Sequence, residues 1–158
     1  MTGEKLVILD RDGVINVDSP DYIKSPEEWH PVPGSLEAIA RLHRFGYRVY
    51  VATNQAGIAR GKLTRSALQA IHHKMLAAIG DAGGAIAGIK YCPHHPDDRC
   101  DCRKPRPGML RAIGKLSGIN IVGQPFVGDS ASDLAAAEAA GCRPVLVLTG
   151  SGRETEKL

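Results

Sequence analysis

The sequence lacks the features that would place a protein in a membrane, outside the cytoplasm or on a nucleic acid. Its first residues, MTGEKLVILD, contain no charged segment followed by a long apolar run, so we expect no signal peptide. No stretch is long and apolar enough to cross a membrane. Lys and Arg number 20 against 17 Asp and Glu, which is too mild an excess for a nucleic-acid-binding surface. These absences predict a cytoplasmic protein with neither a nucleic-acid nor a membrane partner.

Cysteine is also scarce, with four residues in 158, and reduced cytoplasmic thiols argue against disulfides. The chain has no internal repeat, no low-complexity tract and no domain linker. Its length suits one compact domain, so residues 1–158 are expected to form a single unit. The polar tail at 150–158, GSGRETEKL, is expected to be frayed.

Short apolar runs alternate with longer helix-like segments along the chain. The runs are almost continuously hydrophobic, as in strands that helices cover on both faces. Strands are predicted at 6–9, 49–53, 87–91, 125–128 and 144–148, and helices at 35–46, 64–83, 107–118 and 130–141. This alternation predicts an α/β fold with a Rossmann-like, mostly parallel sheet and helices on both of its faces.

Polar residues follow the predicted strands, and ligands of such sheets bind beyond the carboxyl ends of the strands. Asp10 and Asp12 follow the first strand and project to the same side of an extended chain. Close carboxylates repel one another, and a magnesium ion would relieve the repulsion. An ordinary acidic turn explains the two residues equally well.

Other polar residues end other elements of the same predicted sheet. Thr53 ends the second strand, Arg103 and Lys104 precede the third helix, and Asp129 follows the fourth strand. Each also has an ordinary explanation: Thr53 is a residue type common in strands, Arg103 and Lys104 would suit a solvated turn, and Asp129 would suit a helix cap. Their meeting along one edge of the sheet favours a shared anion-binding site.

Four segments resemble the motifs of the haloacid dehalogenase-like (HAD-like) phosphatase superfamily: LVILDRDGVI, VATN, RKP and FVGDSASD. The resemblance spans essentially the whole chain and implies a HAD-like fold without a large cap domain. It implies that Asp10 is the nucleophile and that Asp12 is the general acid and base. Thr53 and Lys104 would hold the phosphoryl oxygens. Magnesium would bind Asp10, Asp129 and the main-chain carbonyl of Asp12.

Three further segments, TNQAGIARGK, CPH…CDC and RKPRPGM, look like those of the D-glycero-D-manno-heptose 1,7-bisphosphate 7-phosphatase family. That resemblance implies removal of the C7 phosphate, giving heptose 1-phosphate for lipopolysaccharide or another surface glycan. The partner would be a small sugar bisphosphate, and the protein would be a monomer. The sequence leaves the preferred anomer at C1 open.

The same resemblance implies a set of substrate contacts. A specificity loop at about 16–30 would contribute Asp18 and Tyr22, and Arg103 would bind the distal C1 phosphate. Further contacts would come from Asn54, Gln55 and Ser130. Ser130 stands where some relatives carry Lys, so one contact is expected to be missing or replaced. Relatives usually continue beyond the fifth strand, which leaves open whether this C-terminus is trimmed.

Cysteine and histidine gather at 92–102, where Cys92-x-His94 and Cys100-x-Cys102 supply three thiolates and an imidazole. This set fits a closed tetrahedral zinc site. Because no coordination position would remain for water, the zinc is expected to be structural, stapling a loop beside Arg103 and Lys104. Scattered structural thiols are the alternative. His95 is a rival ligand, but the spacing favours His94.

Three other functions stay open at this point. Histidinol-phosphate phosphatases share both the phosphatase motifs and a zinc loop. Polynucleotide 3′-phosphatases share a TNQ…RGK segment, although the modest net charge of +3 disfavours them. A zinc-knuckle interaction module, in which the aspartates are only turn residues, would have no enzymatic activity.

Overall fold

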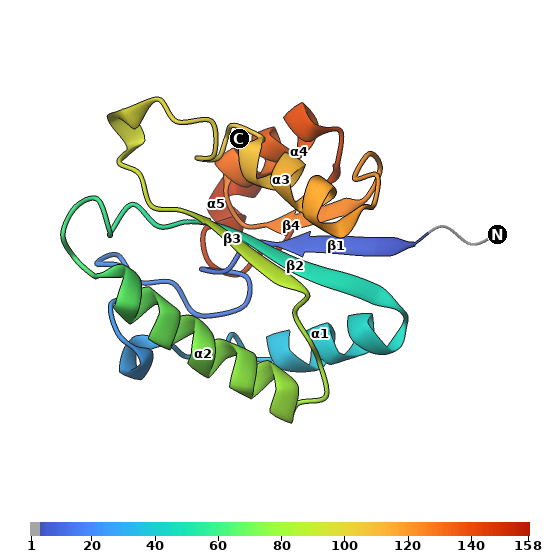
Figure 1. Ribbon diagram of the computed structural model, residues 1–158, viewed down its shortest axis with the longest axis horizontal. Coiled ribbons are helices and arrows are strands. Elements are labelled where there is room, and N and C mark those ends of the chain that lie inside the picture. Colours follow the sequence, from blue (N-terminus) through green and yellow to red (C-terminus); the bar gives the residue numbers. More distant parts are fainter. Residues whose placement is uncertain (1–3) are drawn as a thin grey trace.

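The computed structural model describes residues 4–158 and contains one five-stranded sheet (Figure 1). Its strands are β1 (Lys5–Leu9), β2 (Tyr47–Asn54), β3 (Gly88–Cys92), β4 (Pro125–Gly128) and β5 (Arg143–Leu146). They lie in the order β3-β2-β1-β4-β5, and every neighbouring pair is parallel. The parallel sheet expected from the alternating pattern is therefore confirmed.

Helices cover both faces of the sheet because side chains of each strand alternate between the faces. From β1, Leu6 and Ile8 pack with α3 (Gly108–Ser117) and α4 (Ala131–Ala140). Val7 and Leu9 pack against α1 (Ser35–Arg44) and α2 (Arg65–Asp81). Figure 1 shows the two helix layers on opposite sides of the strands. This arrangement leaves the carboxyl edge of the sheet free for the loops that carry the polar residues.

Local capping fixes where the helices next to this edge begin. The Thr64 hydroxyl accepts a hydrogen bond from the Ala67 N–H at 3.0 Å and caps α2. Helix α4 begins with a capping box in which Ser130 and Asp133 each bind the backbone of the other. The residue after Asp129 therefore starts a helix, which fixes the direction of the chain leaving β4.

The segment between β1 and α1 forms a long loop that includes the short 3-10 helix η1 (Pro26–Glu28). It is held against α2 by Lys74, whose ammonium donates to the carbonyls of Pro26 at 2.7 Å and Trp29 at 2.9 Å. Trp29 is 1% exposed and belongs to the core on that face of the sheet. The expected specificity loop is thus anchored at its far end, and residues 4–158 contain no large cap domain.

The expectation of a frayed tail is wrong. Residues Gly152–Glu156 form helix α5, and two tail residues contact Asp129. The Ser151 N–H donates to Asp129 Oδ2 at 2.9 Å, and the Thr155 hydroxyl donates to the Asp129 carbonyl at 2.8 Å. Polar composition suggested solvent contact, but here two donors of the tail bind the carboxylate and the main-chain carbonyl of the buried Asp129.

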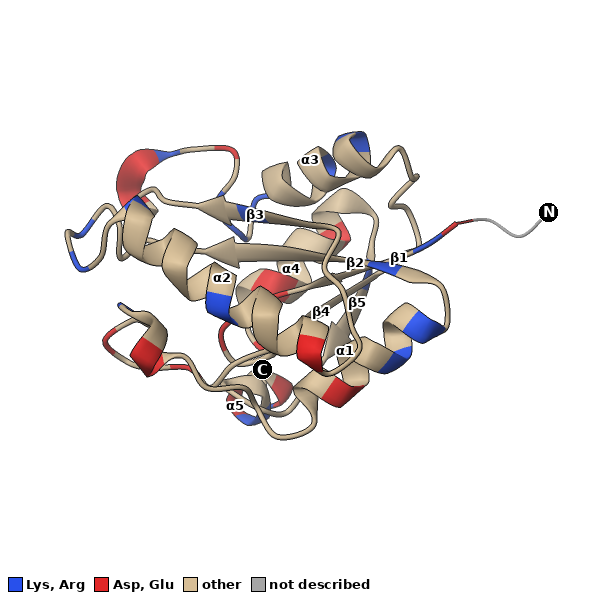
Figure 2. Ribbon diagram, turned by 60° about the horizontal axis from the view of Figure 1, so that its bottom comes forward, with Lys and Arg blue, Asp and Glu red and all other residues tan. Residues whose placement is uncertain are grey.

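The surface agrees with the mild charge balance of the sequence. In the view of Figure 2, acidic and basic residues are interspersed over helices and loops, and no continuous basic stripe is seen from this side. Within residues 4–158, none of the helices combines the length and apolar character needed to traverse a bilayer.

Candidate active site

A cavity of about 310 Å³ lies at the carboxyl edge of the sheet. The residues lining it come from the ends of β1, β2 and β4, from the loop after β1, and from Lys104. A larger cavity of about 570 Å³ lies against α1, and its lining is almost wholly apolar. We take the smaller cavity as the site because buried carboxylates and an ammonium converge only there among the cavities of the described residues.

Most of the predicted site residues meet at this cavity. Those lining it are Asp10, Asp12, Asp18, Tyr22, Thr53, Asn54, Lys104, Asp129 and Ser130. Gln55 and Arg103 do not line it. The lining also includes Asp133, which lies one helical turn after Asp129 and was not among the predicted site residues.

Lys104 is the centre of the charged cluster and is almost fully buried. Its ammonium donates to Asp10 Oδ1 at 2.9 Å, to Asp133 Oδ1 at 2.6 Å and to the Ala52 carbonyl at 3.0 Å. Asp133 also accepts from the Ser130 hydroxyl at 2.9 Å. Sequence reasoning missed Asp133 as a site residue, although its place three residues into a helix beside Asp129 was a usable signal.

Burial and charge act in opposite directions on these groups. Burial raises the pKa of Asp10 well above its ordinary value, and the nearby Lys104 only partly opposes this effect. Burial likewise raises the pKa of Asp129. For Lys104, burial favours the neutral form, but Asp10 and Asp133 outweigh it and raise the pKa. Three buried carboxylates thus lie close together, and the one ammonium beside them pairs with Asp10 and Asp133, so the site carries a deficit of positive charge.

This deficit fits a divalent cation. One oxygen from each of Asp10, Asp129 and Asp133 can be chosen so that all three lie within 4.8 Å of one another. Magnesium binds carboxylate oxygens and would offset their mutual repulsion. Both oxygens of Asp133 already accept hydrogen bonds, Oδ1 from Lys104 and Oδ2 from Ser130, so Asp10 and Asp129 are better placed to offer a free oxygen.

Two glycines allow the backbone to approach Asp129 closely. A Cβ atom at Gly13 would lie 2.1 Å from Asp129 Oδ2, and one at Gly150 would lie 2.2 Å from the same oxygen. Both residues have positive φ, +86° and +57°, which also favours glycine. The Asp-x-Asp-Gly pattern therefore has a steric reason: its glycine makes room for the carboxylate that follows β4.

Gln55 is 2% exposed and supports two other predicted site residues. Its side-chain amide donates to Asp12 Oδ2 at 3.2 Å and to the Thr53 hydroxyl at 2.9 Å. Gln55 does not line the cavity, and its contact with substrate stays a prediction. It holds Asp12 and Thr53 from behind the cavity wall.

Asn54 has a supporting role in addition to its place in the cavity wall. Its amide donates to the Lys104 carbonyl at 3.1 Å, and its carbonyl oxygen accepts from the Lys104 N–H at 3.0 Å. This reciprocal pair ties the end of β2 to the loop before α3. Arg103, the preceding residue, lies half-buried outside the cavity lining.

The loop after β1 contributes Asp18 and Tyr22 to the lining of the cavity. Burial raises the pKa of Asp18. Tyr22 has a positive φ of 61°, and a Cβ atom at Gly57 would lie 3.1 Å from its ring. The loop and the segment after β2 therefore pack closely, which fixes Tyr22 beside the cavity.

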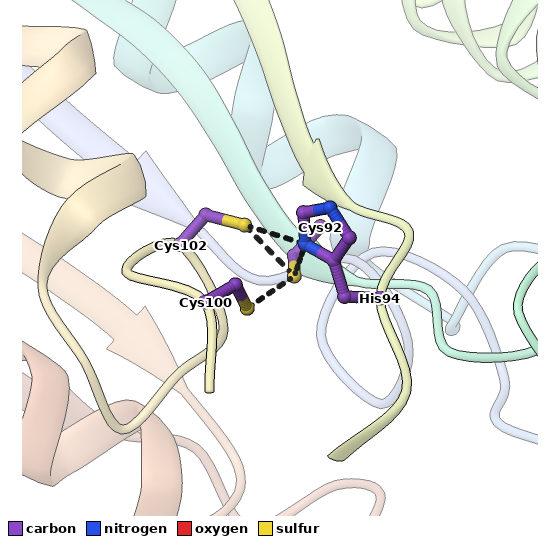
Figure 3. A group of neighbouring side chains, drawn as sticks. All are labelled: Cys92, His94, Cys100 and Cys102. Atoms are coloured by element: carbon purple, nitrogen blue, oxygen red, sulfur yellow. Dashed lines mark hydrogen bonds between the residues drawn. The ribbon is translucent and has the colours of Figure 1, made fainter. Parts of the chain in front are cut away.

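The predicted cysteine and histidine residues form one cluster, shown in Figure 3. Cys92 Sγ lies 3.0 Å from Cys102 Sγ, 3.6 Å from Cys100 Sγ and 3.4 Å from His94 Nδ1. The four ligand atoms all lie within 4.8 Å of one another. His95 is outside the cluster, since its Nδ1 accepts from the Asp97 N–H at 3.1 Å. The preference for His94 over His95 agrees with this geometry.

The burial of these four side chains favours a bound metal cation over a cluster without one. Burial raises the pKa of both Cys92 and Cys102, so thiolates there are unfavourable without a nearby positive charge. A bound cation supplies that charge and stabilises the thiolates together. The cluster connects the end of β3 to the loop before Arg103 and Lys104, so a metal there would brace the segment that carries the site's ammonium.

His72 of α2 should make the stability of the fold depend on pH. Burial, followed by the charge of Arg11, lowers the pKa of His72 from 6.5 to about 4. The unfolded chain binds the proton more tightly, so this contribution is present above pH 6.5 and is lost as the pH falls to about 4. The shift corresponds to about 3 kcal/mol.

Denaturant unfolding of the wild type and of His72→Gln at about pH 7 and about pH 4 measures this contribution. The wild type should lose more stability than the variant on acidification. Equal losses in the two proteins would show that His72 does not cause the dependence.

Comparison with known proteins places the chain in a family. A family model described as HAD-hydrolase-like matches residues 101–158. The D-glycero-β-D-manno-heptose-1,7-bisphosphate 7-phosphatase of Pseudomonas aeruginosa is 57% identical over 150 residues, which cover 95% of this chain and 84% of that protein. The protein of the same name from Escherichia coli K12 is 39% identical over 91% of this chain and 79% of its own length.

A solved structure shows the same relation. The D,D-heptose 1,7-bisphosphate phosphatase from B. bronchiseptica, complexed with magnesium and phosphate, has a TM-score of 0.95 and 54% identity. The match covers 97% of this chain and 86% of that one. Identity this high over nearly the whole chain is decisive: the chain belongs to the D-glycero-β-D-manno-heptose-1,7-bisphosphate 7-phosphatase family of HAD-like hydrolases.

Proposed function

We propose that this chain is a magnesium-dependent phosphatase that removes the C7 phosphate of D-glycero-β-D-manno-heptose 1,7-bisphosphate and releases the 1-phosphate. The observation that supports this most is the convergence of Asp10, Asp12, Lys104 and Asp129 on one cavity. The names of the relatives supply the substrate and the β anomer, which the sequence left open. The product would serve the assembly of heptose-containing lipopolysaccharide or other surface glycans.

The reaction takes two steps, each using groups on the cavity wall. One carboxylate oxygen of Asp10 attacks the C7 phosphorus, the bond from phosphorus to the sugar oxygen breaks, and Asp12 gives that oxygen a proton. Water then attacks the phosphorus of the aspartyl phosphate while Asp12 takes a proton from it, and Asp10 leaves as a carboxylate. Splitting one difficult hydrolysis into two displacements lowers the barrier of each.

Charge neutralisation comes from the remaining residues of the cluster. Lys104 and the Thr53 hydroxyl would hold the non-bridging phosphoryl oxygens. Magnesium, when bound by Asp10, Asp129 and the main-chain carbonyl of Asp12, would offset the charge of the phosphoryl group. Asp133 would hold Lys104 in position, since its Oδ1 lies 2.6 Å from the Lys104 ammonium.

The substrate would be recognised by residues around this centre. Asp18 and Tyr22 face the cavity from the loop after β1, and Ser130 faces it from the start of α4, where they would contact the sugar or its C7 phosphate. Arg103 would bind the distal C1 phosphate. Its Nη1 is buried and has no hydrogen-bond partner among residues 4–158, and a guanidinium fork has the geometry to bind a phosphate.

Replacing Arg103 by Ala should weaken hydrolysis of the bisphosphate selectively. A lost charge-assisted pair should lower kcat/KM for the bisphosphate by roughly 10- to 100-fold. A heptose 7-phosphate without the C1 phosphate should be hydrolysed more slowly than the bisphosphate, and the variant should not slow it further. Arg111→Ala, an exposed change on α3, is the control. Equal losses on both substrates would show that Arg103 does not bind the distal C1 phosphate.

We further propose that the Cys92, His94, Cys100 and Cys102 cluster binds a structural zinc ion. Three thiolates and one imidazole would complete a tetrahedron and leave no position for a catalytic water. Elemental analysis should find one zinc per chain, which Cys100→Ser should lose and Cys142→Ser, a buried change outside the cluster, should keep.

Zinc loss should lower Tm by roughly 5 °C or more, equivalent to about 2 kcal/mol in a chain of this size. It should also slow catalysis, because the segment holding Arg103 and Lys104 would lose its brace. Unchanged melting and turnover after verified zinc loss would contradict the structural role.

A substrate panel tests the proposed function as a whole. It compares the β and α anomers of the heptose bisphosphate with histidinol phosphate and a 3′-phosphorylated oligonucleotide. The β bisphosphate should have the highest kcat/KM. Preference for histidinol phosphate or for the oligonucleotide would assign the chain to the corresponding alternative, and no turnover of any of them would favour a non-enzymatic module. The expected monomeric state and cytoplasmic location stay predictions.

A further inference from the structure

Arg11 is a buried cation that the proposed chemistry does not use. It lies between Asp10 and Asp12 in sequence, and its side chain is 0% exposed. Arg is rarely buried completely unless its charge is paired. Here the pair is Asp12: Arg11 Nη2 lies 2.7 Å and Nε 2.9 Å from Asp12 Oδ1. Burying an arginine costs free energy, and Arg11 adjoins the proposed acid and base. A role in that chemistry would explain its burial.

The bonds to Asp12 distinguish its two oxygens. Oδ1 accepts from Arg11 Nε, from Arg11 Nη2 and, at 3.0 Å, from Asn16 Nδ2. Oδ2 accepts only from Gln55 Nε2, at 3.2 Å, among the described residues. Three donors occupy Oδ1, so Oδ2 is the oxygen that can carry a proton to or from the substrate. Asp12 itself lines the cavity.

His72 holds the far side of the Arg11 guanidinium. Its Nε2 lies 3.1 Å from Arg11 Nη1, and the imidazole is 8% exposed. A guanidinium can only donate, so His72 Nε2 must accept, and the ring is the neutral tautomer protonated at Nδ1. Helix α2 thereby fixes the orientation of the guanidinium through a side chain that does not reach the cavity lining.

We propose that Arg11 and His72 form a positioning pair that keeps Asp12 Oδ1 occupied and presents Asp12 Oδ2 to the leaving sugar oxygen. Neither residue touches substrate, and both act through Asp12. The inference deepens the proposed function and rests on it, since it presupposes that Asp12 transfers the proton. A purely structural buried ion pair is the competing explanation, and the two differ in how an activity loss depends on the leaving group.

The experiment compares two substrates in the magnesium-loaded protein. The heptose bisphosphate has a poor alkoxide leaving group that needs a proton, whereas 2,4-dinitrophenyl phosphate has an acidic phenol that leaves without one. The parameter is kcat/KM, which reports the steps up to departure of the leaving group. The variants are His72→Leu, which removes the acceptor, Arg11→Lys, which keeps the charge but loses the planar fork, and His72→Gln, which keeps an acceptor.

Loss of acid–base positioning should lower kcat/KM for the bisphosphate by roughly 10- to 100-fold in His72→Leu and Arg11→Lys. For the dinitrophenyl ester both variants should stay within about 3-fold of the wild type, because that reaction does not need the proton. His72→Gln should stay close to the wild type on both substrates. Equal losses on both substrates, or no loss on the bisphosphate, would overturn the positioning role. Should His72→Leu fail to fold, Arg11→Lys decides the outcome alone.

Asp12→Asn separates failure of this inference from failure of the proposed function. If that change leaves bisphosphate hydrolysis intact, Asp12 is not the acid and the proposed function itself is wrong in this step. If Asp12→Asn abolishes hydrolysis of the bisphosphate while Arg11→Lys and His72→Leu do not affect it, only the positioning role fails.

Discussion

Replacing Asp10 by Asn should abolish phosphatase turnover while the protein stays folded. Asp10 lies against Lys104 at the end of β1, and the amide has nearly the shape of the carboxylate but cannot form an acyl phosphate. Removal of a covalent nucleophile costs on the order of 10⁴-fold or more in kcat. Because burial raises the pKa of Asp10, its charge is unfavourable in the metal-free fold, so the Asn variant should melt near the wild-type temperature.

The measurement is steady-state release of inorganic phosphate from the heptose bisphosphate, with thermal melting as the test of folding. Asp81→Asn, an exposed change at the end of α2, is the matched control and should leave both unchanged. Retention of more than a small fraction of turnover by a folded Asp10→Asn protein would show that another group is the nucleophile.

Replacing Lys104 by Met should cause the largest loss of stability of any single change in the site. The side chain is 2% exposed and forms ion pairs with Asp10 at 2.9 Å and Asp133 at 2.6 Å. Breaking a buried pair from one side leaves unpaired carboxylates and costs about 3–5 kcal/mol. The same change removes a cation from the phosphoryl group, which should lower kcat/KM by roughly 10²- to 10³-fold.

Denaturant unfolding without magnesium measures the loss of stability. Steady-state kinetics at saturating magnesium measures the loss of activity. Lys115→Met, an exposed change on α3, is the control and should alter neither by much. Added magnesium should recover part of the lost stability, since a second cation would face the same carboxylates. Stability near that of the wild type would mean that Lys104 does not balance Asp10 and Asp133.

The sheet could be predicted from the sequence because each strand is a short apolar run between amphipathic helices. All five predicted strands lie within two residues of those observed, since packing on both faces requires side chains such as Val7 and Ile8 to be apolar. Helix α5 could not be predicted in this way. Its residues are polar, and what orders them is their contact with Asp129, more than twenty residues earlier in the chain.

The site was predictable where residues follow strands, because parallel strands bring their carboxyl ends to one edge. The supporting contacts were not. Asp133 lies in the capping box of α4 and His72 lies within α2, where a strand-end argument does not reach. Gln55 follows β2 but donates its amide to Asp12 and Thr53. Arg103 is the converse case: its role was implied by resemblance, and it lies next to the cavity lining without entering it.

The most direct measurement is to search for phosphate bound to the protein during turnover. Acid-quenched protein would be digested, and each peptide would be weighed by mass spectrometry. Asp12→Asn would be included with 2,4-dinitrophenyl phosphate as substrate, because that leaving group needs no proton in the first step and the variant should slow release of the phosphate in the second. Phosphate should be found on the peptide containing Asp10, and borohydride should convert that residue to homoserine. Turnover with phosphate on another residue, or on no peptide even in Asp12→Asn, would contradict the account.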